Sequence, residues 1–241
     1  MHSKTKSFQF KHFSIYGGNT GMPVSTDGVL LGAWSALSTS KNILDIGTGT
    51  GLLALMCAQR NPTANITGID IHDSAIEAAH TNFSASAWAE RLTLHHGDVI
   101  DYALANNQSF DTIICNPPYF NSGEQAALQA RATARHTDTL SHHDLLNSCA
   151  TLLNANGRAS FILPTLEADQ LIAHAIQSQW HLTRLCKIRT TETKSHSRYL
   201  FELQLKGSET VKTEQSELII HQQGSYSAQF IALTQSFYLK M

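Results

Sequence analysis

The chain has 241 residues, of which 42% are hydrophobic and 15% charged, and its formal net charge is -2 at pH 7. This length and composition predict one soluble globular domain and exclude a disordered, collagen-like or coiled-coil chain. The near-neutral charge gives no global positive field, so any binding of nucleic acid must depend on local patches. The four cysteines are far apart and favour a reducing cytosol over a disulfide framework. No apolar run reaches the length of a membrane span, and we expect a cytoplasmic protein with no membrane contact.

Residues 1–41 precede the first core strand. They contain Phe8, Phe10 and Phe13 ahead of a glycine-rich turn at 17–21. Turn residues between apolar runs predict a hairpin here, followed by a lead-in helix at 29–37.

From residue 42 on, short β-rich runs alternate with helical runs, which indicates a doubly wound α/β sheet with mostly parallel strands and helices on both faces. The predicted strands are 42–46, 65–71, 91–96, 110–115 and 157–163. The predicted helices are 51–59, 74–86, 143–153 and 167–179. Ser74 and Glu77 fit a capping box at the start of the second of these helices. The β-rich runs 180–189 and 198–205 follow without a helix and predict a final antiparallel hairpin.

The end of the chain contains a polar stretch at 207–216, a short predicted strand at 217–221 and a predicted helix at 227–238. Because there is no internal repeat or linker, we predict a single domain, 1–241. It comprises an N-terminal hairpin and helix (1–41), a catalytic core (42–206) and a C-terminal strand and helix (207–241).

The first core strand ends in the run D-I-G-T-G-T-G, which opens with Asp45. Gly47, Gly49 and Gly51 can turn tightly and bring backbone N–H groups close to a ligand, although a tight turn alone is the alternative. A dinucleotide fingerprint needs G-x-G-x-x-G, and its third glycine position is Leu52 here. The run resembles motif I of class I S-adenosylmethionine (SAM) methyltransferases, whose fold is a Rossmann-like seven-stranded sheet. The resemblance implies that the loop contacts the methionine part of SAM and that Asp45 acts on its ammonium group.

Two further strand ends contain an aspartate. Asp70 ends the second strand, where an acidic side chain can accept both ribose hydroxyls of an adenosine, whereas its neighbour Asp73 suits helix capping equally well. Asp98 follows the third strand and resembles the residue that binds the adenine amino group, with an ordinary turn aspartate as the alternative. The residues that follow, Ile71 and Val99, belong to the same predicted cofactor site.

The fourth strand ends in N-P-P-Y, which begins at Asn116. Consecutive prolines stop a strand and leave the Pro117 carbonyl free to accept a hydrogen bond. Together with the Asn116 side-chain carbonyl, it can bind both N–H bonds of a planar amino group and release the nitrogen lone pair toward the SAM methyl. Tyr119 can stack on the base. The predicted catalytic residues are Asn116, Pro117 and Tyr119, and Asn116 also belongs to the predicted cofactor site.

Methyltransferases that share NPPY act on nucleic-acid amino groups or on protein glutamine. DNA enzymes usually have a large insertion between core strands, and glutamine enzymes an N-terminal helical domain; neither is evident here. The chain resembles the bacterial valine-tRNA adenine-N6 methyltransferases, which modify the purine immediately 3′ of the anticodon. The likeness covers nearly the whole chain and lies in segments 10–13, 25–34, 45–51, 88–91, 116–119, 226 and 232–238. It implies a SAM-dependent tRNA adenine-N6 methyltransferase, with Thr26 and Asp27 near the methionine end of SAM or, equally, capping a helix.

A tRNA partner needs cations, and these form three clusters. The clusters are Lys4, Lys6 and Lys11 with His2 and His12; Arg131, Arg135 and His136; and Arg184, Lys187, Arg189, Lys194 and Arg198. Adjacent histidines at 95–96 and 142–143 diverge on a strand or helix, so we expect no metal site. We also expect a monomer. Protein glutamine-N5 methylation and a non-catalytic RNA-binding role are the alternative functions.

Overall fold

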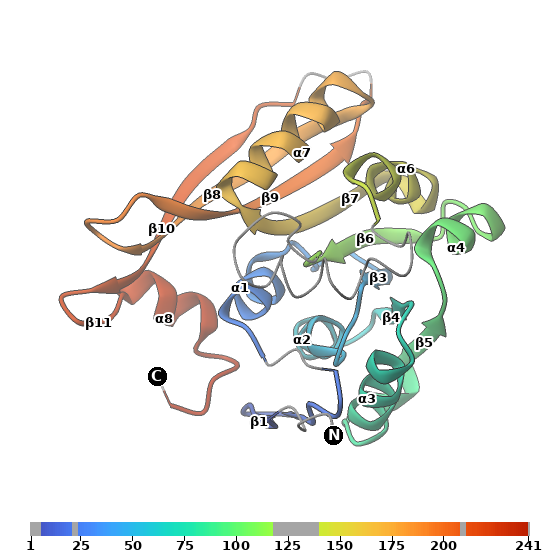
Figure 1. The fold of residues 1–241 in the computed structure, drawn as a ribbon, viewed down its shortest axis with the longest axis horizontal. Coiled ribbons are helices and arrows are strands. Elements are labelled where there is room, and N and C mark those ends of the chain that lie inside the picture. Colours follow the sequence, from blue (N-terminus) through green and yellow to red (C-terminus); the bar gives the residue numbers. More distant parts are fainter. Residues whose placement is uncertain (1–5, 21–23, 118–139, 208–210, 241) are drawn as a thin grey trace, which may run out of the picture.

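The computed structural model of the protein describes residues 6–20, 24–117, 140–207 and 211–240. A small hairpin consists of β1 (Phe8–Gln9) and β2 (Ser14–Ile15). The other strands are β3 (Asn42–Ile46), β4 (Asn65–Asp70), β5 (Leu92–His96), β6 (Phe110–Cys115), β7 (Leu153–Pro164), β8 (Trp180–Thr191), β9 (His196–Leu205), β10 (Glu214–Gln222) and β11 (Ser225–Tyr226). Within the described residues they form one sheet in the order β11-β10-β8-β9-β7-β6-β3-β4-β5, which crosses the molecule in Figure 1.

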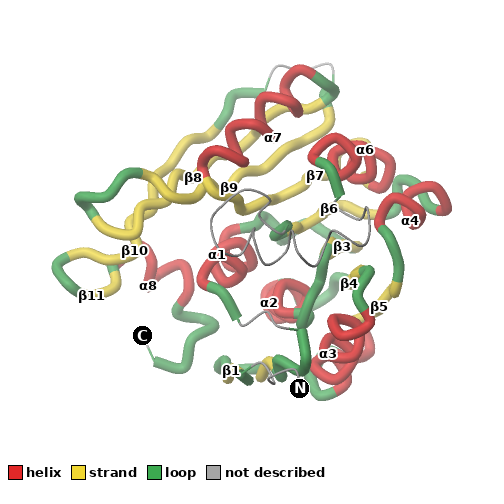
Figure 2. Tube along the Cα trace, in the orientation of Figure 1, coloured by secondary structure: helices red, strands yellow, loops and turns green. Residues whose placement is uncertain are grey.

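Helices cover both faces of this sheet, as Figure 2 shows in red. They are α1 (Thr26–Trp34), α2 (Leu52–Arg60), α3 (Asp73–Ser84), α4 (Val99–Ala105), α6 (His142–Leu152), α7 (Thr165–Gln177) and α8 (Ala228–Thr234), with a short 3₁₀ turn, η1 (Ala89–Arg91). The apolar core is split between the two faces. One part includes residues of α1, α2, α3 and α8, and the other includes residues of α4, α6 and α7.

Strand β7 illustrates why the predicted strands are continuous apolar runs. Phe161 and Leu163 pack in the core on the α6 and α7 face, whereas Ile162 between them packs on the α1 and α2 face. Because successive side chains of a strand point to opposite faces, a strand covered on both sides needs apolar residues at every position.

The topology confirms the predicted fold class and extends it. Strands β3, β4, β5, β6 and β7 pair in parallel, and β9 pairs antiparallel with β7 and β8. The sheet is nevertheless larger than the seven strands expected. The hairpin of β8 and β9 does not end it, because β10 pairs in parallel with β8, and β11 then pairs antiparallel with β10.

Several predicted element ends are wrong. The capping box is absent, because Ser74 lies inside α3, whose N-cap is His72 without a side-chain hydrogen bond. Helix α1 begins at Thr26, three residues before its predicted start, and its N-cap Ser25 accepts a hydrogen bond from the Gly28 amide. Helix α4 was not predicted. At the other end, α8 is shorter than the helix expected at 227–238.

The two ends of the chain contact each other. Phe10 forms an isolated β-bridge with Tyr238, and the Lys11 amide donates to the Phe237 carbonyl at 2.8 Å. The Lys11 ammonium also donates to the Gln235 carbonyl. The rings of Phe10 and Phe13 stack at 4.7 Å, so the N-terminal aromatic segment is largely a packing element.

Candidate functional site

The candidate site lies at the carboxyl edge of the parallel strands, where the loop between β3 and α2 starts. Gly47, Gly49 and Gly51 have φ angles of 68°, 56° and 80°. This left-handed region strongly favours glycine, because a Cβ would meet the backbone there. The three glycines are therefore required by the turn itself, and the turn directs the loop backbone over the edge of the sheet.

Asp45 lies at the base of this loop and is fully buried. Its Oδ2 accepts hydrogen bonds from Thr48 Oγ1 at 2.7 Å and from the Ala54 amide at 3.1 Å. Its buried Oδ1 has no hydrogen-bond partner among the described residues. Burial raises the pKa of Asp45 to about 7, although both hydrogen bonds act to lower it and nearby Asp70 raises it further. A buried oxygen without a partner is costly, so a donor supplied by a ligand would be strongly favoured.

Asp70 ends β4 next to the glycine loop. Its Oδ2 accepts a hydrogen bond from the Gly49 amide at 2.9 Å, and its Oδ1 accepts one from the His72 amide at 3.0 Å. The carboxylate is thus fixed by two backbone donors, and each oxygen keeps a second lone pair. The sequence did not indicate that Asp70 also holds the glycine loop in place.

The other predicted adenosine residues have mixed environments. Asp98 is the N-cap of α4, and its Oδ1 accepts a hydrogen bond from the Ile100 amide at 2.8 Å. Val99 is buried and Ile71 is exposed. Asp73 does not cap α3 but lies in its first turn, where its exposed carboxylate is 3.4 Å from His96 Nε2. Asp98, for which a turn was the alternative prediction, therefore caps a helix. The prediction that Asp73 caps a helix is wrong, because the N-cap of α3 is His72.

Asn116 and Pro117 directly follow β6 at the same edge. A Cβ placed on Gly28 would lie 4.0 Å from Asn116 Nδ2 and 3.1 Å from Leu52 Cδ2. The first turn of α1 thus approaches both the start of α2 and the end of β6. Tyr119 lies outside the described residues.

Thr26 and Asp27 open helix α1, and neither is its cap. Asp27 Oδ2 instead accepts a hydrogen bond from Arg198 Nε at 2.8 Å. The sequence suggested Arg198 only as one of several cations for RNA. No local pattern could have linked two residues that are 171 positions apart.

Some members of two predicted cation clusters make contacts within the fold. Lys11 holds the C-terminal segment, and Arg184 lies 3.9 Å above the Trp34 ring while pairing with Glu202. Arg189 pairs with Glu217 at 2.6 Å. The residues Lys4, His2, Arg131, Arg135 and His136 lie outside the described part of the chain.

A metal site or a reactive thiol would depend on histidine, cysteine and acidic side chains in the described ranges. No group of three or more histidine, cysteine, aspartate or glutamate side chains there could hold a metal ion. All four cysteines are buried, and burial raises the pKa of the Cys115 thiol well above its usual value, so Cys115 is not an activated nucleophile. In the same ranges, no helix is long and apolar enough to span a membrane.

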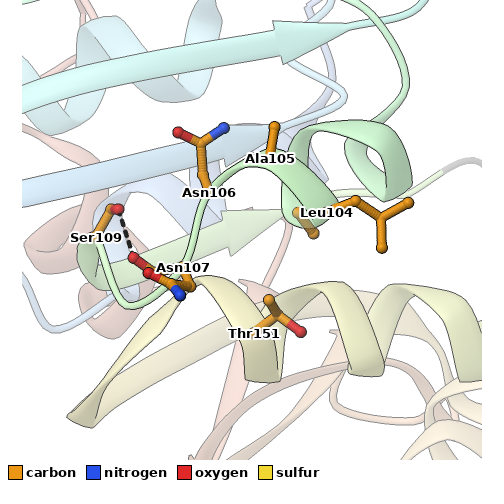
Figure 3. A pocket seen from close by; sticks show the side chains of 7 residues that line it. Leu104, Ala105, Asn106, Asn107, Ser109 and Thr151 are labelled. Carbon is orange, nitrogen blue, oxygen red and sulfur yellow. Dashed lines mark hydrogen bonds between the residues drawn. The ribbon is translucent and has the colours of Figure 1, made fainter.

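The pocket in Figure 3 lies away from these residues. It is lined by the end of α4, the segment 105–109 and Thr151 at the C-terminal end of α6. These residues precede β6 and β7, so the pocket lies at the amino edge of the sheet. In doubly wound folds, ligands bind at the carboxyl edge. We therefore assign the candidate site to the glycine loop and the neighbouring strand ends.

Comparisons with known proteins show which family and which folds the chain resembles. The methyltransferase small domain model matches residues 27–178. The tRNA1(Val) (adenine(37)-N6)-methyltransferase of Vibrio campbellii is 56% identical over 99% of this chain and 98% of its own. Among solved structures, a predicted O-methyltransferase from Agrobacterium tumefaciens has a TM-score of 0.70 at 20% identity, covering 88% of this chain and 96% of its own. A glycopeptide N-methyltransferase solved with SAM has a TM-score of 0.54 at 15% identity, covering 76% and 100%.

Proposed function

The chain belongs to the tRNA1(Val) (adenine(37)-N6)-methyltransferases within the methyltransferase small domain family, and from this we infer that it transfers a methyl group from SAM to N6 of a tRNA adenine. We propose the anticodon-loop purine 3′ of the anticodon in valine tRNA as the target. The relatives' names support this target, and the observation that most supports methyl transfer from SAM is the meeting of Asp45, Asp70 and Asn116 at one edge of the sheet.

The described residues fit the cofactor. Asp45 Oδ1 is a buried acceptor without a partner in the described part of the chain, which suits an ammonium group. Asp70 keeps lone pairs for ribose hydroxyls, and Asp98 keeps lone pairs for an adenine amino group. SAM would supply an electrophilic methyl group. We propose that Gly47, Gly49 and Gly51 follow its methionine part, with Thr26 and Asp27 nearby, and that Ile71 and Val99 flank its adenine.

The target side of the site is proposed to consist of Asn116, Pro117 and Tyr119. The Asn116 side-chain carbonyl and the Pro117 main-chain carbonyl accept the two amino hydrogens and orient the nitrogen lone pair. Transfer would break the sulfonium S–CH3 bond of SAM and leave a neutral thioether, and the methylated nitrogen would then release one proton to water. No strong base is required, because the nitrogen becomes acidic only as it takes the methyl. An adenine in an anticodon loop is already largely unpaired, so moving it into the site costs little.

The test is methyl transfer from labelled SAM to tRNA purified from cells that lack this gene. We expect ribonuclease-sensitive label and, by nucleoside mass spectrometry, N6-methyladenosine in the fragment 3′ of the anticodon. Label in a protein that resists ribonuclease would instead indicate glutamine methylation. Absence of both transfer and SAM binding would indicate a non-catalytic RNA-binding protein. A single domain, a monomeric state, independence from metal ions and a cytoplasmic location stay predictions.

A further inference from the structure

One ion pair ties the first turn of α1 to strand β9. Arg198 Nε donates to Asp27 Oδ2 at 2.8 Å, and Arg198 Nη1 donates to the Ser197 carbonyl at 2.8 Å. The two side chains are 32% and 20% exposed. A guanidinium held on two sides and partly shielded from water forms a more restrictive contact than an open surface pair. The pair can therefore hold α1 in a defined position.

The strand register places Arg198 at the same edge of the sheet as Asn116. Cys115 of β6 pairs with Phe161 of β7. Three residues later in β7, Pro164 pairs with Arg198 of β9. Asn116, one residue after Cys115, is level with Ile162 of β7, so Arg198 lies two strands away and two residues, or roughly 7 Å, further toward the carboxyl edge.

The first turn of α1 bridges this distance. At one side Asp27 is bound by Arg198, and at the other Gly28 approaches Asn116 Nδ2 and Leu52 Cδ2. Leu52 opens α2 directly after the glycine loop. A displacement of this turn would therefore be felt at the glycine loop and at the end of β6 together.

We propose that Arg198 is a positioning residue for the proposed cofactor site. By binding Asp27, it fixes the first turn of α1 against the glycine loop and Asn116. An aspartate in the first turn already interacts favourably with the helix dipole, so the contribution of Arg198 is the lateral position of the helix. The inference rests on the proposed function only in naming SAM as the ligand.

Arg184 offers a matched control from the same hairpin. Its guanidinium lies 3.9 Å above the ring of Trp34, the last residue of α1, and it pairs with Glu202 of β9. Arg184 thus contacts the far end of the same helix. Arg184→Met and Arg198→Met each remove one arginine contact with α1, and only the second removes a contact at the proposed cofactor site.

The experiment is calorimetric titration of the full-length variants with SAM. We expect Arg198→Met to weaken SAM about tenfold, and Arg184→Met to leave SAM affinity within about twofold while lowering the melting temperature. Arg198→Lys should give an intermediate loss, because an ammonium keeps the charge but not the planar fork. Asp27→Asn alone and the double variant Arg198→Met/Asp27→Asn should each bind SAM about as weakly as Arg198→Met alone. In tRNA methylation, Arg198→Met should lower kcat more than it raises the KM for tRNA.

Unchanged SAM affinity in Arg198→Met would overturn the proposal, as would an equal loss in Arg184→Met or additive losses in the double variant. A weaker affinity for tRNA with a shallower salt dependence and normal SAM binding would make Arg198 an RNA contact instead. A wild-type protein that binds SAM but does not methylate tRNA would contradict the proposed function, and the SAM titrations would still decide the role of Arg198.

Discussion

Two aspartates near opposite edges of the sheet have contrasting environments. Asp111, near the amino edge, accepts hydrogen bonds from the amides of Lys41 and Asn42 and from the side chain of Asn154, so both of its oxygens are used. Burial acts to raise the pKa of Asp111, but these hydrogen bonds lower it below its usual value. Asp45, near the carboxyl edge, has one buried oxygen without a described partner and a pKa raised to about 7.

The difference shows how the same residue type serves structure or binding. A carboxylate whose lone pairs are satisfied by the chain stabilises the fold and has nothing to gain from a ligand. A buried carboxylate with one oxygen that accepts no hydrogen bond lowers the stability of the fold. A cationic hydrogen-bond donor on a ligand offsets this cost and favours the ionised carboxylate. Folding alone therefore satisfies the hydrogen bonds of Asp111 at the amino edge. At the carboxyl edge, Asp45 Oδ1 would gain a hydrogen-bond donor only when a ligand binds.

The largest effect is expected from removing the proposed acceptor of the target amino group at the carboxyl edge. Asn116→Ala should lower turnover at saturating tRNA by about a hundredfold or more, because its interaction counts mainly in the transition state. SAM affinity should stay within about twofold. Single-turnover kinetics and calorimetry measure the two quantities, and near-normal turnover would exclude the proposed role of Asn116.

A smaller loss is expected for Asp70→Ala. Removing charge-assisted hydrogen bonds to ribose hydroxyls should weaken SAM by about 1.5–3 kcal/mol, or roughly ten- to a hundredfold. Asp70→Asn keeps one carbonyl acceptor for the Gly49 amide and should lose less SAM affinity. Comparing the two variants separates the loss of ribose binding from damage to the turn at Gly49. If calorimetry found unchanged SAM affinity in Asp70→Ala, the ribose role would pass to Asp73.

The pKa of Asp45 predicts a pH dependence of SAM binding. The carboxylate that attracts the ammonium group is present above about pH 7, so affinity should fall up to tenfold per unit as the pH drops below 7. Affinity should also fall above about pH 8, where an α-amino group loses its charge. Calorimetry across pH 5.5–9 tests this, with Asp45→Asn as the control that removes the acidic limb. An acidic limb that survived in Asp45→Asn would point to another group.

The smallest effect is expected at the amino edge. Asp111→Asn should reduce stability by about 1 kcal/mol, because the charge-assisted hydrogen bonds of this carboxylate are partly exposed and water can partly replace them. In a chain of this length, that corresponds to roughly 2–4 °C in melting temperature.

The sign of the pH effect at Asp111 also follows from its lowered pKa. Its contribution to stability should be complete above the unfolded pKa of about 3.9 and should disappear as the pH falls below that value. Thermal melts of the wild type and of Asp111→Asn between pH 3 and 7 measure this pH dependence. Calorimetry at pH 7.5 should give equal SAM affinities for the two proteins. A loss of SAM affinity in Asp111→Asn would mean that the two edges are not independent.

The sequence predicted the strands of the core because their signals are local. The bounds of β3 and β6 match the predicted ones, since short apolar runs flanked by polar residues define them on both sides. Strand ends then gave the positions of Asp45, Asp70 and Asn116 at one edge, because parallel strands share the direction in which they end.

Long-range partners explain what the sequence missed. The sequence predicts a ligand or turn residue at Asp98 and no helix after it. In the structure Asp98 caps helix α4 by accepting a hydrogen bond from the Ile100 amide. The strand β10 joins β8 in parallel although β9 and a polar segment lie between them in the sequence. The partnership of Asp27 and Arg198 likewise depends on the sheet order, which brings β9 next to β7, and no spacing in the sequence encodes it.

The contact between the two ends of the chain has a consequence for synthesis. Lys11 binds Gln235, 224 residues later, and Phe10 is bridged to Tyr238. At about 5–20 residues per second, a ribosome needs roughly 10–45 s to make the residues that lie between them. The β-rich core from β3 to β9 can form during that time, and Phe13 can already pack against Trp88, but Phe10 lacks its bridge to Tyr238 until the C-terminal segment has been made. The contacts of Phe10 and Lys11 with residues 235–238 are therefore among the last native contacts that can form.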